Sequence, residues 1–253
     1  MYTRVKTPAE QAAMRESGKM LASVLKLLSG KVEAGMTTKD LALVAASELK
    51  ALGGEAPFLG YGRPAFPDVI CISVNEEVVH GIPGHRVIND GDIVSLDFGV
   101  KYKGMITDSA LSLIAGNPKD QRHVELVEFT EKAMLAGINA LRDGVRTGDV
   151  GAAIQIVLDR KRYGIVRDLV GHGVGHELHE DPNIPNYGRP GGGPVLHGGM
   201  TIAVEPMATL GGEAVYVADD DWTVLTRDGS WAAHFEHSVL ITEEGAEILT
   251  ERH

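Results

Sequence analysis

The feature that most constrains the fold of this chain is a weak internal repeat. HGIPG at residues 80–84 resembles HGVGH at 172–176, and GDIVSLDFG at 91–99 resembles GMTIAVEPM at 199–207. In each half, a His-Gly turn precedes an apolar strand. We therefore expect an α+β fold with a single domain made of two pseudosymmetric halves, residues about 1–116 and 117–253.

The repeated strands carry acidic residues at equivalent places. Asp97 and Glu205 are each the seventh residue of the repeated segment, and a second acidic residue follows in each half, Asp108 or Glu236. The second half has a longer spacing because it contains DPNIPNYGRPGGGP at 181–194. The Pro and Gly content of this stretch predicts a surface loop.

Both halves predict the same order of elements, two helices followed by strands. Apolar periodicity, caps and Gly or Pro stops predict helices at 9–28, 37–53, 118–141 and 147–163. Short apolar runs bounded by turn residues predict strands at 69–74, 92–100, 105–114, 200–207 and 237–242.

Composition limits the classes of partner. A formal charge of −11 repels phosphate backbones and anionic lipids, and 5 Phe, 6 Tyr and 2 Trp leave little aromatic surface for base stacking. No run approaches the roughly 18 apolar residues that cross a bilayer. One cysteine, Cys71, and a polar N-terminal segment favour a cytoplasmic protein. We expect neither a nucleic-acid partner nor a membrane partner.

Asp97 and Asp108 lie in two apolar strands joined by the turn KYKG at 101–104. A turn centred between Tyr102 and Lys103 predicts that the two aspartates face each other directly, roughly 5 Å apart. Two bare charges at that distance repel by on the order of 3 kcal/mol at an effective dielectric near 20. Exposure at a sheet edge would relieve this repulsion, but the apolar neighbours favour burial, and a buried pair must share a proton or bind a cation.

Three further residues are candidate ligands: His172 in GHGVGHELHEDP, Glu205 in TIAVEPM and Glu236 in HFEHSVLIT. Four carboxylates and one imidazole form an oxygen-rich set, which suits two divalent ions bridged by carboxylates. Taken singly, each residue is explained as well by a solvated acid or a core histidine. The duplicated placement is what predicts a dinuclear site.

Other site types have weaker support. His172, His176 and His179 have a spacing that suits a mononuclear zinc site on a helix, but glycines at 171, 173 and 175 disfavour that helix. The Gly-rich runs lack the nucleotide-binding patterns, and no GxSxG motif is present. Cys71 has no evident base partner, which disfavours a cysteine nucleophile.

Five segments together resemble the ordered signatures of type I methionine aminopeptidases: SVNEEVVHGIP, DIVSLDFGVKYKGMITDSA, GHGVGHELHEDPNIPNYG, GMTIAVEPM and DGSWAAHFEHSVLIT. The resemblance extends from the first helix to the last strand and is closest to the short bacterial form. It implies the pita-bread fold, in which two halves enclose a dinuclear metal centre between curved antiparallel sheets with outer helices.

The resemblance also implies roles for the candidate ligands. Asp97 would hold one metal ion, Asp108 and Glu236 would bridge both ions, and His172 and Glu205 would complete the other. The cofactor would be two divalent ions per chain, with Co, Mn, Fe, Zn and Ni all compatible. A hydroxide activated by both metals would attack the carbonyl after the N-terminal methionine, and Glu205 would pass its proton to the leaving amine.

The resemblance further implies residues that contact the substrate. His80 and His179 match histidines that hydrogen-bond the scissile peptide and stabilise the oxyanion. Cys71 and Trp222 match the methionine pocket, where a soft apolar wall suits a thioether. Phe66 and Tyr61 join this pocket as candidates. The chain departs from the family at His176, which often aligns with Arg, and at Leu178, where some members carry an aromatic residue.

The function implied is removal of the initiator methionine from nascent proteins whose second residue is small. The partners would be nascent polypeptide N-termini near the ribosome, and we expect a monomer. The alternatives are a mononuclear His-zinc hydrolase, a proline-specific peptidase of related fold, and a non-catalytic binding protein on the same fold. Proline-specific peptidases generally carry an extra N-terminal domain, and the retained ligands disfavour a non-catalytic protein.

Overall fold

The computed structural model describes residues 5–252, which contain four helices and 14 strands. The helices are α1 (Pro8–Ser29), α2 (Thr38–Leu52), α3 (Gln121–Asn139) and α4 (Thr147–Asp159). The strands are β1 (Ile70–Val74), β2 (Glu77–Val79), β3 (Ile93–Tyr102), β4 (Met105–Ile114), β5 (Gly164–Ile165), β6 (Gly171–Gly173), β7 (Glu180–Ile184), β8 (Thr201–Val204), β9 (Met207–Thr209), β10 (Val215–Val217), β11 (Val224–Thr226), β12 (Ala232–His234), β13 (Glu236–Ile241) and β14 (Ala246–Ile248). The predicted helices and the main strands are present, with shifted ends.

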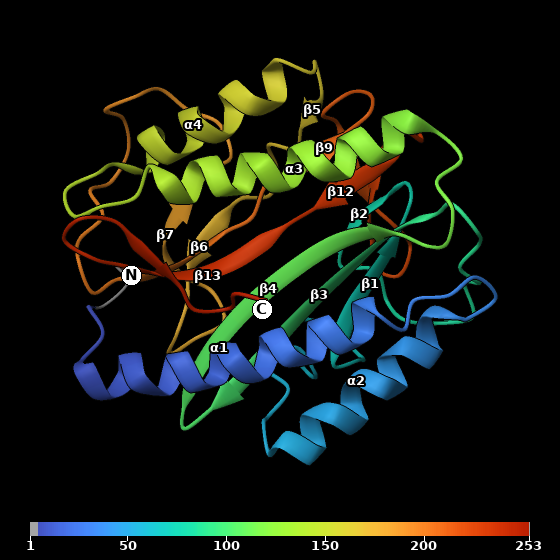
Figure 1. Cartoon of the computed structure of the whole chain (residues 1–253), viewed down its shortest axis with the longest axis horizontal. Coiled ribbons are helices and arrows are strands. Elements are labelled where there is room, and N and C mark those ends of the chain that lie inside the picture. The colour runs from blue at the N-terminus through green and yellow to red at the C-terminus, as the bar shows by residue number, and fades with distance from the viewer. Residues whose placement is uncertain (1–4, 253) are drawn as a thin grey trace.

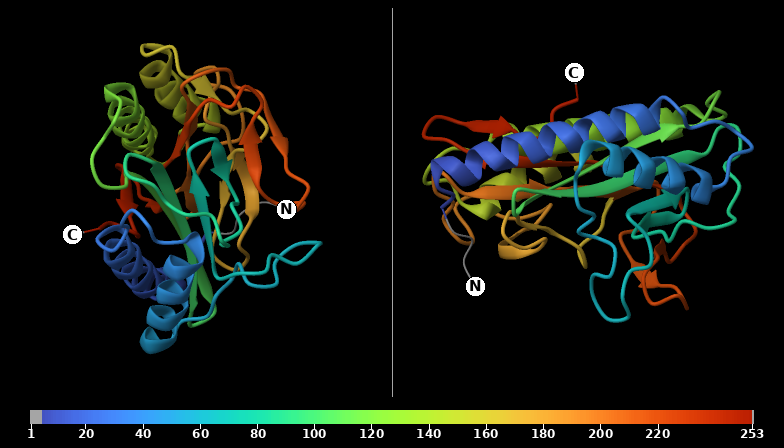
Figure 2. Two further views of the ribbon diagram at one scale, coloured as in Figure 1. Left: turned by 90° about the vertical axis from the view of Figure 1, so that its right-hand side faces the viewer. Right: turned by 90° about the horizontal axis from the view of Figure 1, so that it is seen from below.

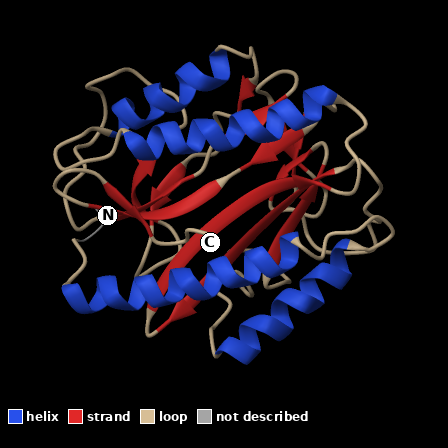
Figure 3. Cartoon of the chain, in the orientation of Figure 1, coloured by secondary structure: helices blue, strands red, loops and turns tan. Residues whose placement is uncertain are grey.

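A curved antiparallel sheet forms the centre of the molecule (Figure 1), with the strand order β1-β3-β4-β13-β8-β6-β7 and β14 paired to β13. The helices pack on its outer side, as the edge-on view in Figure 2 shows. Figure 3 shows that α1 and α2 cover one part of the sheet and α3 and α4 the other. Both halves thus contribute a helix pair and strands, while the boundary near residue 116 stays a prediction.

Sequence signals at the helix ends explain where these helices begin and stop. Thr7 and Thr37 cap α1 and α2, and each forms a reciprocal capping box with the acidic residue three positions later. Gly53 ends α2 in the left-handed conformation, with φ of 76°. These local signals fix the helix ends independently of the sheet.

The hairpin register predicted for β3 and β4 is wrong. Asp97 pairs with Ala110 and Gly99 pairs with Asp108, so the two aspartates are diagonal rather than directly opposite. The reason is the turn: Lys103 and Gly104 both have positive φ, 49° and 79°, as a two-residue type I′ turn requires. Because side chains alternate with a period of two, this register still leaves both carboxyl groups on one face of the sheet.

The composition of residues 181–194 predicted a surface loop, and this prediction is only partly correct. The first residues of this stretch continue β7, which pairs with β6, and Pro182, Ile184 and Asn186 are buried. The start of this segment pairs with β6 at the edge of the sheet, and this tertiary contact outweighs the loop preference of its Pro and Gly residues. Only the part after Asn186 has the expected loop character.

The two parts of the sheet meet where β4 pairs with β13, and serine side chains reinforce this junction. Ser109 Oγ donates to the Glu236 carbonyl oxygen at 2.6 Å, and Ser238 Oγ donates to the Asp108 carbonyl oxygen at 2.8 Å. The Asp108 backbone N–H in turn lies 2.8 Å from Ser238 Oγ. These buried contacts fix the backbone of two candidate ligands relative to each other.

Candidate metal centre

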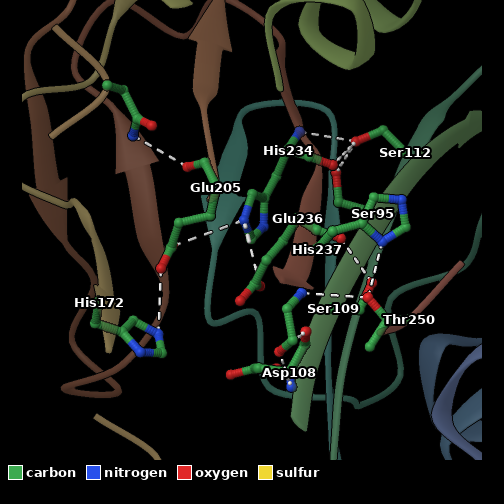
Figure 4. A network of polar contacts seen from close by, with 12 residues as sticks. Ser95, Asp108, Ser109, Ser112, His172, Glu205, His234, Glu236, His237 and Thr250 are labelled. Atoms are coloured by element: carbon green, nitrogen blue, oxygen red, sulfur yellow. Dashed lines mark hydrogen bonds and ion pairs between the residues drawn. The ribbon is translucent and has the colours of Figure 1, made fainter. Parts of the chain in front are cut away.

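The five predicted metal ligands come from five strands that lie next to one another in the central sheet, in the order β3-β4-β13-β8-β6. Asp97 lies on β3, Asp108 on β4, Glu236 at the start of β13, Glu205 directly after β8, and His172 on β6. All five are buried, with at most 9 % of each residue exposed. The fold therefore brings together carboxylates that are far apart in the sequence, as Figure 4 shows for four of the five.

Burial changes the protonation chemistry of these groups. Desolvation raises the pKa of Asp108 to about 7, and it raises the pKa of Asp97, Glu205 and Glu236 well above the ordinary value, with neighbouring carboxylates adding to the effect. Burial also lowers the pKa of His172 to about 3, so its imidazole is neutral and can act as a ligand. Such a cluster is stable only with protons or cations bound.

The donor set fits divalent metal ions. Asp108, His172 and Glu236 each offer a ligand atom, and these atoms all lie within 4.8 Å of one another. His172 Nδ1 lies 2.9 Å from the carbonyl oxygen of Gly173, which directs Nε2 to the site, where it is 3.2 Å from Glu205 Oε1. Asp97 Oδ1, Asp108 Oδ1 and Glu236 Oε1 are buried and lack a hydrogen-bond partner within residues 5–252, as expected of oxygens that bind cations.

The two histidines predicted to contact substrate line the same cavity as the candidate ligands. His80 follows β2 with φ of 60°, and burial lowers its pKa to about 4. His179 precedes β7, and its ring centroid is 4.3 Å from that of His172. The hydroxyl of Tyr61 lies 2.6 Å from His179 Nδ1, a contact that orients the imidazole.

The predicted methionine-pocket residues line the same cavity. Cys71 on β1 pairs with Asp97, and Phe66 contacts the Trp222 ring edge to face at a centroid distance of 5.2 Å. Trp222 is also 6.0 Å from the His80 ring and reaches the cavity from between β10 and β11. Tyr61 is also a lining residue. All the candidate site residues thus share one cavity, which has an apolar end beside the carboxylates.

The position of His176 argues against the mononuclear zinc alternative. Its Nε2 atom lies 2.7 Å from Glu10 Oε1, at the start of α1, and its Nδ1 atom is 3.5 Å from Glu180 Oε1. Neither of the two candidate ligand groups within residues 5–252 includes it. Leu178, the other departure from the family pattern, is buried and lines the cavity.

Sequence reasoning missed two polar residues near the carboxylates. His234 ends β12 and belongs to a second group of potential ligands with Glu205 and Glu236. Asn186 is fully buried and donates from Nδ2 to the Glu205 carbonyl oxygen at 3.0 Å. His234 could have been found from the period of a strand, because it lies two positions before Glu236. The sequence around Asn186 carries no comparable signal.

Comparisons with known proteins agree with this geometry. The model of metallopeptidase family M24 matches residues 12–243. Methionine aminopeptidase 1 of Bacillus subtilis is 44% identical over 245 residues, which are 97% of this chain and 98% of the relative. A solved methionine aminopeptidase from Thermotoga maritima superposes with a TM-score of 0.95 at 45% identity and covers 98% of this chain and 99% of that chain.

More distant structures share the architecture. A prolidase from Pyrococcus furiosus superposes with a TM-score of 0.77 at 24% identity and covers 98% of this chain and 65% of that chain. Such a likeness shows the fold alone. The curved antiparallel sheet with helices on one side is the pita-bread fold, which confirms the predicted α+β class. The chain belongs to metallopeptidase family M24.

Proposed function

We propose that this chain is a metal-dependent methionine aminopeptidase that removes the N-terminal methionine from new polypeptides whose second residue is small. The observation that carries the proposal is the convergence of four buried carboxylates and a neutral imidazole from five successive strands. Close relatives that cover nearly the whole chain support the same activity.

We assign the five residues to two divalent ions. Asp97 would hold one ion, Asp108 and Glu236 would be shared, and His172 with Glu205 would hold the other. Ions bound there lower the pKa of water and polarise the scissile carbonyl. Among the chain's own groups, Glu205 is our candidate to carry a proton to the leaving amine, since its carboxyl lines the same cavity as His80 and His179.

His179 and His80 would bind the scissile peptide as neutral hydrogen-bond donors. Burial lowers the pKa of both imidazoles, so each keeps a single ring proton near neutral pH. If the Tyr61 hydroxyl donates to Nδ1 of His179, the ring proton lies on Nε2. An N–H donor at this position would stabilise the developing oxyanion.

The apolar end of the cavity would receive the methionine side chain. Phe66 and Cys71 are buried there, and Trp222 closes one side. Burial and the nearby carboxylates raise the pKa of the Cys71 thiol, so Cys71 is a neutral, polarisable wall and not a nucleophile. Tyr61 would complete this pocket while it orients His179.

The partners would be the N-termini of nascent polypeptides, with a cytoplasmic monomer acting near the ribosome. The single cysteine, which cannot form a disulfide within the chain, fits a reducing compartment such as the cytoplasm. Within residues 5–252, no helix has the length and apolar character that crossing a bilayer requires.

Peptide hydrolysis tests the proposal. Purified chain supplied with Co²⁺ or Mn²⁺ should release methionine from Met-Gly and Met-Ala peptides and much less from Met-Lys peptides. Asp97→Ala and His172→Ala should abolish turnover, whereas His197→Ala, at an exposed position, serves as the control and should leave it unchanged.

Two results would contradict the proposal. Equal release from all three peptides would remove the claim of selectivity for a small second residue. Activity that survives Asp97→Ala and disappears with both His172→Ala and His176→Ala would instead favour the mononuclear zinc hydrolase. Circular dichroism of each variant separates lost chemistry from lost folding.

A further inference from the structure

His234 is a buried imidazole that the five-ligand assignment leaves without a role. It is 1% exposed, and neither ring nitrogen has a hydrogen-bond partner within residues 5–252. Its Nε2 atom lies 3.9 Å from Glu205 Oε2 and also 3.9 Å from Glu236 Oε2 (Figure 4). A buried polar ring that points at two carboxylates needs an explanation, because unpaired polar groups are costly inside a protein.

The backbone holds His234 firmly in this position. Its N–H lies 2.8 Å from Ser112 Oγ, and its carbonyl oxygen accepts from the same hydroxyl at 2.9 Å. It also pairs with Met207 in the β12–β9 ladder. The ring therefore enters the site from a fixed point and faces Glu205 Oε2, whereas His172 faces Glu205 Oε1.

The two imidazoles beside Glu205 differ in the surroundings of Nδ1. In His172, Nδ1 lies 2.9 Å from a carbonyl oxygen, so the proton is on Nδ1 and the Nε2 lone pair is free to bind a metal ion. In His234, Nδ1 has no acceptor among the described residues. Two carboxylates face Nε2 instead, and they favour the tautomer with the proton on Nε2.

We propose that His234 is a positioning residue of the metal centre and not a ligand. Its Nε2–H faces Glu205 Oε2 and Glu236 Oε2, 3.9 Å from each, and the N–H dipole orients both carboxylates for the ions. The inference rests on the proposed metal-dependent function and adds a sixth residue to the five assigned to the metal centre. Groups that orient metal ligands in this way typically change metal affinity by about 10–100-fold when they are removed.

Metal titration of three variants tests this role. Binding of Mn²⁺ to the metal-stripped full chain is measured by calorimetry for the wild type, His234→Ala and His234→Gln. The alanine variant should bind at least one ion about 10–100-fold more weakly. The glutamine variant keeps an N–H donor and should recover most of that affinity. His237→Gln is the matched control, since His237 is also buried but contacts Thr250.

A second measurement separates a positioning residue from a ligand. Electron spin echo modulation of the Mn²⁺-loaded wild type counts coordinated imidazoles, and we expect one. Two coordinated imidazoles, or a glutamine variant as weak as the alanine variant, would overturn the proposal. Wild-type affinity in a folded His234→Ala variant would overturn it as well.

The same experiment distinguishes failure of this inference from failure of the proposed function. If the wild type binds the ions and cleaves Met-Ala peptides while His234→Ala is unchanged, only the role of His234 is lost. If the wild type itself binds no divalent ion, the metal-dependent function fails and this inference fails with it.

Discussion

Removal of the metal ions should make the stability of this protein fall as the pH rises above neutrality. In the folded state, burial raises the pKa of Asp108 to about 7 and raises the pKa values of Asp97, Glu205 and Glu236 well above the ordinary range. In the unfolded chain, such carboxyl groups titrate near pH 4. Between pH 4 and the raised pKa values of the folded state, the folded protein binds more protons than the unfolded chain.

The sign of the effect follows from this difference in bound protons. The stabilising contribution of a carboxyl group with a raised pKa is fully present below about pH 4 and is lost as the pH rises through its folded pKa. While a carboxyl is protonated in the folded protein and ionised in the unfolded chain, each unit of increase in pH lowers the free energy of unfolding by about 1.4 kcal/mol.

Buried histidines oppose this trend at lower pH. Burial lowers the pKa of His172 to about 3 and that of His80 to about 4, so the unfolded chain binds more protons than the folded protein below about pH 6.5. At pH 7.5 and above, these imidazoles are about nine-tenths or more neutral in the unfolded chain and neutral in the folded protein. The interval from pH 7.5 to 8.5 therefore isolates the carboxyl contribution.

Urea denaturation of the chelator-treated protein at pH 7.5, 8.0 and 8.5 measures this effect. We expect the free energy of unfolding to fall across the series by at least about 1.4 kcal/mol, the value for one carboxyl over one pH unit. Saturating Mn²⁺ should remove or reverse the fall, because the ions compete with protons for the same oxygens. A flat or rising profile in protein confirmed to be metal-free by elemental analysis would refute the reasoning.

Three single substitutions probe other parts of the structure. Lys6→Met removes the 2.8 Å ion pair with Glu180, whose carboxylate keeps the backbone N–H donors of His176 and Glu177, and should cost about 1–3 kcal/mol in urea denaturation; an unchanged free energy of unfolding would argue against a contribution from this pair. Tyr61→Phe removes the 2.6 Å contact with His179 and should lower kcat/KM about five-fold, equivalent to about 1 kcal/mol, and an unchanged value would show that the contact does not orient the ring. Gly81→Ala places a Cβ 2.3 Å from a carbonyl oxygen of β1, so thermal unfolding should show a loss of about 1–3 kcal/mol, and wild-type stability would mean that the backbone yields there.

The sequence was sufficient to predict the four helices and the five main strands because their signals are local. Capping threonines and Gly53 define α1 and α2, and acidic residues that interrupt apolar strands identified Asp97 and Glu205. The hairpin register was predicted wrongly because moving the turn centre by one residue shifts each pairing partner by two residues. Asp97 and Asp108 then stay on the same face of the sheet, so the pattern of apolar residues fits both registers. The left-handed conformations at Lys103 and Gly104, which centre the turn between these two residues, distinguish the two registers.

Other parts of the site depend on contacts between distant segments. Asn186 lies in a stretch whose composition predicts a loop, and its burial follows from the pairing of β7 with β6. His234 shares a face with Glu236, but only the fold places Glu205 beside both. Local patterns can identify candidate ligands, whereas the groups that orient them come from tertiary structure.

The position of β13 also determines when the metal centre can first exist. This strand lies in the middle of the sheet, between β4 and β8, although it comes late in the order of synthesis. Until residue 236 has been made, β4 has a bare edge and the candidate ligand on β13 is missing. A nascent copy that stops short of β13 would therefore lack a complete site and be prone to pair through that edge.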